Sequence, residues 1–278
     1  MKKLDRLVWA AGISFTSYGV RIGVRTNTPE LLDKVLPHLP AGWKIASSPV
    51  VGRLYSAIQG STPMRSNVRS FHLLYANLER RERLENLDHL VESLVSDIET
   101  HIAQATRQRL FLHAGVVGWM GRAIVFPGRS LSGKSTLTRE FLRAGAEYFS
   151  DEFAVLDAEG GVHPFPRPLS IRDGDPQNGN HTRFTAEELG AKAGKKPLPL
   201  SLVVLARYKE GARWRPRVIS QGQGVLGLMA NAVAARNQPH RALVILEKTM
   251  RQAHVLRGTR GEAKETVESI LRYLENSD

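Results

Sequence analysis

Residues 128–136 of this 278-residue chain read Gly128-Arg129-Ser130-Leu131-Ser132-Gly133-Lys134-Ser135-Thr136. They fit the pattern G-x-x-x-x-G-K-[ST], which is typical of a phosphate-binding loop. The apolar residues 123–126 before the loop predict a short buried strand, and the spacing of Leu137, Phe141 and Leu142 after it predicts a helix over 137–144. A strand, a loop and a helix in this order are the context that the motif requires. The alternative is a chance glycine-rich turn in front of a helix.

The chemistry of such a loop explains its residue types. Glycines let the backbone curl so that successive N–H groups point at phosphate oxygens, and the N-terminus of the helix adds partial positive charge. We therefore expect all nine residues 128–136 to bind the phosphates of a nucleotide. Lys134 is expected to reach the terminal phosphates, and the Ser135 hydroxyl is expected to hold Mg²⁺.

Phosphoryl chemistry also needs a carboxylate, and the best candidates are Asp151 and Glu152. They follow a strand-like segment after the loop's helix, and ligands of α/β proteins bind at the carboxyl ends of strands. One acid is expected to orient Mg²⁺, for which we assign Asp151, while its neighbour takes a proton from the acceptor. The two roles can be exchanged, and a solvated acidic turn is the alternative.

Three further side chains are weaker candidates. His113 lies on a predicted buried strand over 110–117, where a histidine is more often a satisfied core residue than a catalytic one. Arg129 and Arg167 are candidate phosphate clamps in a chain that is rich in arginine.

Composition limits the classes of partner. The net charge of +12 suggests a polyanionic or acidic partner, which a nucleotide explains in part. The basic residues are scattered without an aromatic and basic recognition stretch, so we expect no nucleic-acid partner. The chain has no cysteine, which fits a reducing cytoplasm, and no apolar run approaches the length of a membrane span. We expect a folded cytoplasmic protein that has no membrane partner.

The hydrophobic pattern divides the chain into two expected domains, residues 1–107 and 108–278. The first contains a predicted hairpin over 13–26, a short helix after Thr28, strands at 53–59 and 70–76, and a long helix over 84–106. The second holds the loop, a further strand at 200–205, helices from 222 towards 234 and over 262–274, and a segment at 242–246 that fits either a strand or a helix. Residues 173–181 consist mainly of Gly, Asp, Pro, Gln and Asn, which predicts a loop and a candidate for a mobile lid over the nucleotide. The fold class is α/β, or α+β over both domains, with a small N-terminal α+β accessory domain.

These residues resemble the catalytic domain of the HPr kinase/phosphorylase family. The resemblance is carried by Leu112-His113-Ala114-Gly115, by the loop, and by Ala144-Gly145-Ala146 followed by Ser150-Asp151-Glu152. It covers about residues 110–172. It implies a P-loop kinase domain with a phosphoenolpyruvate-carboxykinase-like fold, in which ATP phosphorylates a Ser hydroxyl. It also implies that Lys134 and His113 belong to the active site and that the acidic pair supplies the base. The family forms rings, so a homo-oligomer is compatible with the resemblance.

The chain departs from the family pattern at several positions. The second acid of the family's Asp-Asp pair is Glu152 here, and the family's metal-binding Glu in a Leu-Glu-Ile-Arg segment is replaced by Ser170 in Leu169-Ser170-Ile171-Arg172. Arg236 is a weak substitute for a late catalytic Arg. The motif Phe165-Pro166-Arg167-Pro168-Leu169 is similar to that of HPr-kinase-related proteins of peptide-modification systems, such as lasso-peptide-type gene clusters.

The sequence therefore predicts an ATP- and Mg²⁺-dependent kinase that phosphorylates a Ser of a protein or precursor peptide, with His113, Lys134, Asp151 and Glu152 as its catalytic residues. The N-terminal domain is expected to recognise that substrate. One alternative is a small-molecule kinase of the same fold. Another is a nucleotide-binding regulatory protein without transferase activity, for which Ser170 would be the sign of decay. Neither the acceptor nor the preference for adenine over guanine can be read from the sequence.

Overall fold

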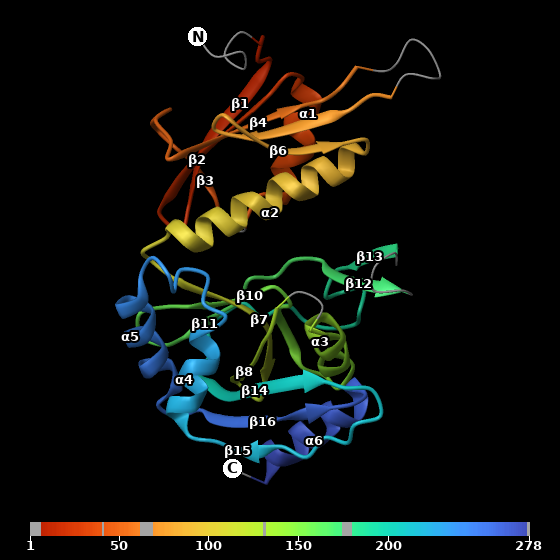
Figure 1. The fold of residues 1–278 in the computed structure, drawn as a ribbon, viewed down its shortest axis with the longest axis vertical. Helices are drawn as coiled ribbons and strands as arrows, with labels where there is room; N and C mark the ends of the chain where they lie inside the picture. Colours follow the sequence, from red (N-terminus) through yellow and green to blue (C-terminus); the bar gives the residue numbers. More distant parts are fainter. Residues whose placement is uncertain (1–6, 41, 62–68, 130–131, 174–179, 277–278) are drawn as a thin grey trace. The chain divides into compact units, whose positions relative to one another are not determined.

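The computed structural model describes residues 7–40, 42–61, 69–129, 132–173 and 180–276. These residues form a mixed α/β protein with six α-helices and a short 3₁₀ helix. The chain divides into two compact units, residues 1–108 and 109–278, which are drawn in Figure 1. The boundary expected from the sequence, after residue 107, lies one residue before this division.

The N-terminal unit is a six-stranded sheet with two helices. Its strand order is β3-β1-β2-β4-β5-β6. Its elements are β1 (Ala11–Ser17), β2 (Val20–Thr26), α1 (Pro29–Val35), the 3₁₀ helix η2 (Leu36–His38), β3 (Lys44–Ile45), β4 (Arg53–Ile58), β5 (His72–Ala76), β6 (Glu79–Leu84) and α2 (Leu87–Ala105).

Local sequence rules explain most of this unit. Tyr18 and Gly19 both have positive φ, as the two-residue turn of a β-hairpin requires, and they join β1 to β2. The Thr28 side chain caps α1 by accepting a hydrogen bond from the Leu31 N–H, and Asn86 caps α2 in the same way. The long helix begins later than the sequence predicts because residues 79–84 form a charged edge strand.

The C-terminal unit contains a mixed eight-stranded sheet with the order β11-β10-β7-β8-β14-β16-β15, in which β9 pairs with β7. Its strands are β7 (Leu110–Trp119), β8 (Arg122–Pro127), β9 (Glu147–Ser150), β10 (Phe153–Leu156), β11 (Val162–His163), β14 (Leu200–Tyr208), β15 (Arg217–Val218) and β16 (His254–Arg260). Its helices are α3 (Lys134–Arg143), α4 (Gln221–Met229), α5 (Pro239–Met250) and α6 (Ala263–Glu275). A separate two-stranded sheet pairs β12 (Leu169–Asp173) with β13 (Asn180–Phe184).

Helices cover both faces of the eight-stranded sheet, and alternate residues of each strand point to opposite faces. On one face Ile124, Phe126 and Leu202 pack with the apolar side chains of α3 and α6. On the other face Val125 and Val203 pack with α4 and α5. Figure 1 shows α4 and α5 on one side of β14 and β16 and α6 on the other.

The central strands β8, β14 and β16 are mutually parallel, so their carboxyl ends meet at one edge of the sheet. This edge carries the end of β8 at Pro127, from which the loop starts. Strand β7 runs antiparallel to β8 and to β10, and His113 pairs with Phe153 in that register. The topology thus brings the loop, His113 and the acidic pair to the same part of the sheet.

The structure resolves or revises several expectations. Residues 242–246 belong to helix α5, and α4 ends at Met229 rather than near 234. The expected loop over 173–181 is wrong at its ends, because Asp173 belongs to β12 and Asn180 and His181 belong to β13, whose backbones pair. Its centre, residues 174–179, lies outside the described residues. In the part of the chain that the structure describes, no helix is both long and apolar enough to cross a membrane.

Candidate functional site

The loop lies where the sequence predicts it, between β8 and α3. Gly128 donates its N–H to the carbonyl of His113 at 3.1 Å, which ties the start of the loop to strand β7. Ser132 donates its N–H to the Arg129 carbonyl at 3.2 Å. Ser130 and Leu131 lie outside the described residues. Helix α3 begins at Lys134, so its unpaired N–H groups and its partial positive charge face the loop.

Lys134 is half-buried and folds back over the loop. Its Nζ donates to the carbonyls of Gly128 and Arg129 at 2.9 and 3.0 Å. An ammonium group has three donors, so one remains for a further acceptor. Burial lowers the pKa of Lys134, while the carboxylates of Glu152 and Asp151 act in the opposite direction.

Ser132 supplies an independent indication that the loop binds a ligand. Its Oγ is buried within the loop and has no hydrogen-bond partner among the described residues. A buried hydroxyl without a partner is costly. A phosphate oxygen seated in the loop would accept a hydrogen bond from this hydroxyl, so the residues present fit a bound phosphate.

Arg260 lies behind the loop and was not anticipated from the sequence. It ends β16, is 3% exposed, and donates from Nη1 to the Gly261 carbonyl at 2.9 Å and from Nη2 to the Gly133 carbonyl at 3.4 Å. Its guanidinium also lies 5.0 Å from the centre of the Tyr208 ring. Gly133 has a φ of 82°, and a Cβ at this position would collide with Nη2 of Arg260. Arg260 therefore fixes the end of the loop and adds a buried positive charge at the N-terminus of α3.

Asp151 connects the loop's helix to the end of β9. Its Oδ2 accepts a hydrogen bond from Ser135 Oγ at 2.8 Å, and its Oδ1 accepts one from the Tyr148 hydroxyl at 3.0 Å. Burial raises the pKa of Asp151, although the hydrogen bonds from Ser135 and Tyr148 limit the rise. Because both oxygens already accept hydrogen bonds, this carboxylate is held in a fixed position beside the Ser135 hydroxyl.

Glu152 faces a different partner. Its Oε1 lies 3.7 Å from Nδ1 of His113, and the two side chains are 44% and 42% exposed. The contact with His113 lowers the pKa of Glu152, and the charge of Lys134 acts in the same direction against the effect of burial. The neighbouring acids thus differ, since Asp151 is buried and hydrogen-bonded whereas Glu152 is accessible and readily ionised.

The remaining candidates are distributed unevenly. The positive charge of Arg167 acts on both Asp151 and Glu152 and lowers the pKa of each, which places this residue near the acidic pair. Arg129 is exposed on the loop, and Thr136 is exposed in the first turn of α3. Arg236 is exposed in the turns between α4 and α5.

A Mg²⁺ ion would depend on ligands beyond the protein. No group of three or more His, Asp or Glu side chains that could hold a metal ion occurs in the described ranges. Mg²⁺ commonly binds one or two protein ligands together with substrate phosphates and water. The hydroxyl of Ser135 and the carboxylate of Asp151 provide such a partial site next to the loop.

Comparison with known proteins adds no relative to this description: the sequence matches no protein-family model and no curated protein. The site therefore has to be judged on its own geometry.

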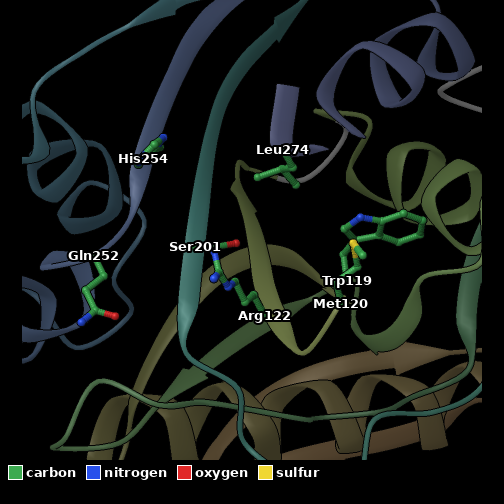
Figure 2. Close-up of a pocket in the computed structure, with 7 residues that line it drawn as sticks. All are labelled: Trp119, Met120, Arg122, Ser201, Gln252, His254 and Leu274. Atoms are coloured by element: carbon green, nitrogen blue, oxygen red, sulfur yellow. The ribbon is translucent and has the colours of Figure 1, made fainter. Parts of the chain in front are cut away.

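A second hollow lies at the opposite edge of the sheet, and Figure 2 shows its lining. Its side chains come from the amino ends of β8, β14 and β16, the β7–β8 turn and α6, and include Arg122, Ser201 and His254. The lining contains no carboxylate, and His254 is engaged with the Tyr273 hydroxyl at 2.9 Å. We therefore assign the candidate active site to the carboxyl edge.

Proposed function

We propose that this protein is a P-loop kinase of the HPr kinase/phosphorylase type that transfers the γ-phosphoryl group of ATP to a Ser hydroxyl of a protein or peptide. The observation that carries the proposal is the hydrogen bond from Ser135 Oγ to Asp151 Oδ2. It joins the residue expected to bind Mg²⁺ to the acidic pair. In the sequence, the two partners are sixteen positions apart.

Binding and charge neutralisation fall to the loop. The backbone N–H groups and the N-terminus of α3 hold the phosphates, and the free donor of Lys134 Nζ contacts a terminal phosphate oxygen. Ser135 and Asp151 would hold Mg²⁺, and the bound ion would supply positive charge beside the transferring group. Arg260 supports the loop through the hydrogen bond from its Nη2 to the Gly133 carbonyl.

The differing environments of the two acids favour Glu152 as the base. Asp151 uses both oxygens within the protein, whereas Glu152 is accessible and ionised. Glu152 accepts the proton of the Ser hydroxyl while the hydroxyl oxygen bonds to the γ-phosphorus. The bond from that phosphorus to the β–γ bridging oxygen breaks, and ADP leaves. His113 positions Glu152 through the 3.7 Å contact.

We further propose that the N-terminal unit recognises the acceptor and that the protein acts in the cytoplasm. Its buried helix faces and six-stranded sheet make it a separate folded module. Such a module can hold a peptide while the C-terminal unit performs the transfer.

The test uses the full chain with γ-labelled ATP, Mg²⁺, a library of Ser-containing peptides and, separately, a pool of metabolites. The proposal predicts label on peptide Ser residues, no label on the matched Ala peptides, and a loss of turnover of about 100-fold or more in Glu152→Gln with nucleotide affinity retained. Label on metabolites alone would favour the small-molecule kinase. Nucleotide binding without transfer to any acceptor would favour the regulatory protein.

A further inference from the structure

An open pocket occupies the carboxyl edge of the parallel strands, on the sheet face opposite helix α3. Its volume is about 430 Å³. We name it the Arg207–Arg257 pocket. Its lining includes Pro127, Leu205, Arg207, Asn231, Arg257 and Thr259.

Two residues of the pocket lining are joined through the backbone to elements of the candidate active site. Pro127 ends β8 and is followed directly by the first residue of the phosphate-binding loop. The carbonyl of Asn231 accepts a hydrogen bond from the His113 N–H at 2.9 Å, so this wall is fixed to the strand that carries His113. His113 alternates with Leu112 and Ala114, which point to the face of α4 and α5, so the His113–Glu152 pair lies on the other face of the sheet. A peptide that reaches both the pocket and this pair would pass over the carboxyl edge of the sheet.

Alternation along the strands separates this pocket from the phosphate site. Val203 and Val255 point to the face covered by α4 and α5, and Arg207 and Arg257 follow them at even spacing on the same face. Arg260 has the opposite parity and lies on the face of α3, where its Nη2 contacts the loop. The two arginines of the pocket are thus distinct from the groups that would neutralise a triphosphate.

The charge of the pocket is positive. Arg207 and Arg257 are exposed, and neither forms an ion pair with any residue in the described part of the chain. No acidic side chain lines the pocket. Arg217 of β15, also exposed, is the direct cross-strand neighbour of Arg257. Like charges directly opposite one another are destabilising, and an anion between them removes that cost.

We propose that the Arg207–Arg257 pocket binds carboxylate side chains that flank the acceptor Ser, so that the substrate is an acidic peptide segment. The inference rests on the proposed kinase function. A guanidinium fork matches the geometry of a carboxylate and binds it through two parallel hydrogen bonds. The net charge of +12 attracts such a peptide over a longer range.

The test measures kcat/KM for three Ser peptides that differ only in their flanks, which are Glu, Gln or Lys. The full-length protein is expected to prefer the Glu flanks by about fivefold for each arginine that is engaged. The variant Arg207→Glu with Arg257→Glu is expected to reverse the order in favour of Lys flanks, with ATP affinity unchanged.

The matched control is Lys195→Glu with Lys196→Glu. It makes the same change in net charge at two exposed residues that precede β14, at the opposite edge of the sheet. The control is expected to keep the preference for Glu flanks. Equal rates for all three peptides in the wild-type protein, or an equal loss on all three in the Arg207→Glu/Arg257→Glu variant, would overturn the inference.

A binding measurement separates this inference from the kinase proposal. Fluorescence anisotropy of the same labelled peptides reports docking without turnover. Preferential binding of the Glu-flanked peptide that is lost in the arginine variant supports the pocket even where no peptide is phosphorylated, and that result would contradict the kinase function alone. Tighter binding of an RNA oligonucleotide than of the Glu-flanked peptide, with both lost in the arginine variant, would assign the pocket to nucleic acid instead.

Discussion

Substituting Gly133 by Ala tests how tightly the loop is built. Gly133 has a φ of 82°, in the left-handed region, where an alanine costs about 1 kcal/mol of conformational energy. Its Cβ would also collide with Nη2 of Arg260, so the guanidinium must leave its two backbone carbonyls. Hydrogen bonds from charged groups are worth roughly 1.5 to 3 kcal/mol. We therefore expect Gly133→Ala to lower the free energy of unfolding by about 3 kcal/mol and to abolish tight nucleotide binding.

The chain offers a matched control in Gly145, at the other end of α3. It has a φ of 97°, but a Cβ there would meet nothing within 4 Å. Gly145→Ala should lower the free energy of unfolding by about 1 kcal/mol in urea denaturation, with unchanged nucleotide affinity in calorimetry. In an Arg260→Ala background, Gly133→Ala should cost only this smaller amount. Equal effects of the two glycine substitutions on stability and on binding would show that Arg260 does not exclude a side chain at position 133.

Three further substitutions follow from the site. Lys134→Met removes the ammonium that remains able to donate to phosphate, so we expect a roughly tenfold to hundredfold loss of ATP affinity in calorimetry, and an unchanged affinity would contradict its assigned role. Asp151→Asn should abolish Mg²⁺-dependent binding without lowering the melting temperature at neutral pH. Burial raises the pKa of Asp151, so its ionised form disfavours the folded state. The difference in melting temperature between the variant and the wild type should therefore shrink as the pH falls through that pKa. Tyr148→Phe removes a hydrogen bond that favours the ionised form of Asp151. The loss of Mg²⁺-dependent binding on acidification should therefore occur at higher pH in the variant than in the wild type. A shift to lower pH would contradict this role of Tyr148.

The elements that could be predicted from the sequence are those specified by nearby residues. The strand, loop and helix around residues 128–136 follow from glycine placement and apolar spacing, and the structure places them as expected. The hairpin over residues 11–26 follows from alternation and a turn that contains glycine. The cap of α1 by Thr28 follows from the preference for hydroxyls at that position.

The elements that sequence reasoning missed depend on distant partners. Strand β6 reads as a charged segment because it is an edge strand, whose exposed residues carry no apolar alternation. Strand β16 was not anticipated, and with it Arg260, whose contact with Gly133 spans 127 residues. The only local signal of β16 is the apolar pair Val255 and Leu256 within a polar run, which fits several structures.

The two acids illustrate the same limit. Their sequence position indicates a role at a strand end but does not distinguish them. Ser135 and Tyr148 donate hydrogen bonds to the two carboxylate oxygens of Asp151. Glu152 instead contacts His113, which the pairing of β7 with β10 brings near it. Such differences arise from tertiary packing, and no spacing rule encodes them.

A crystal structure of the full chain with a non-hydrolysable ATP analogue and Mg²⁺ would show whether residues 128–136 and the acidic pair bind one triphosphate together. We expect the triphosphate in the loop, with its terminal phosphate in contact with Lys134. We expect Mg²⁺ bound to Ser135 and held directly or through water by Asp151, and Glu152 facing the γ-phosphate with room for a hydroxyl. A nucleotide bound at the opposite edge of the sheet, or a bound triphosphate from which Asp151 and Glu152 both point away, would contradict this expectation.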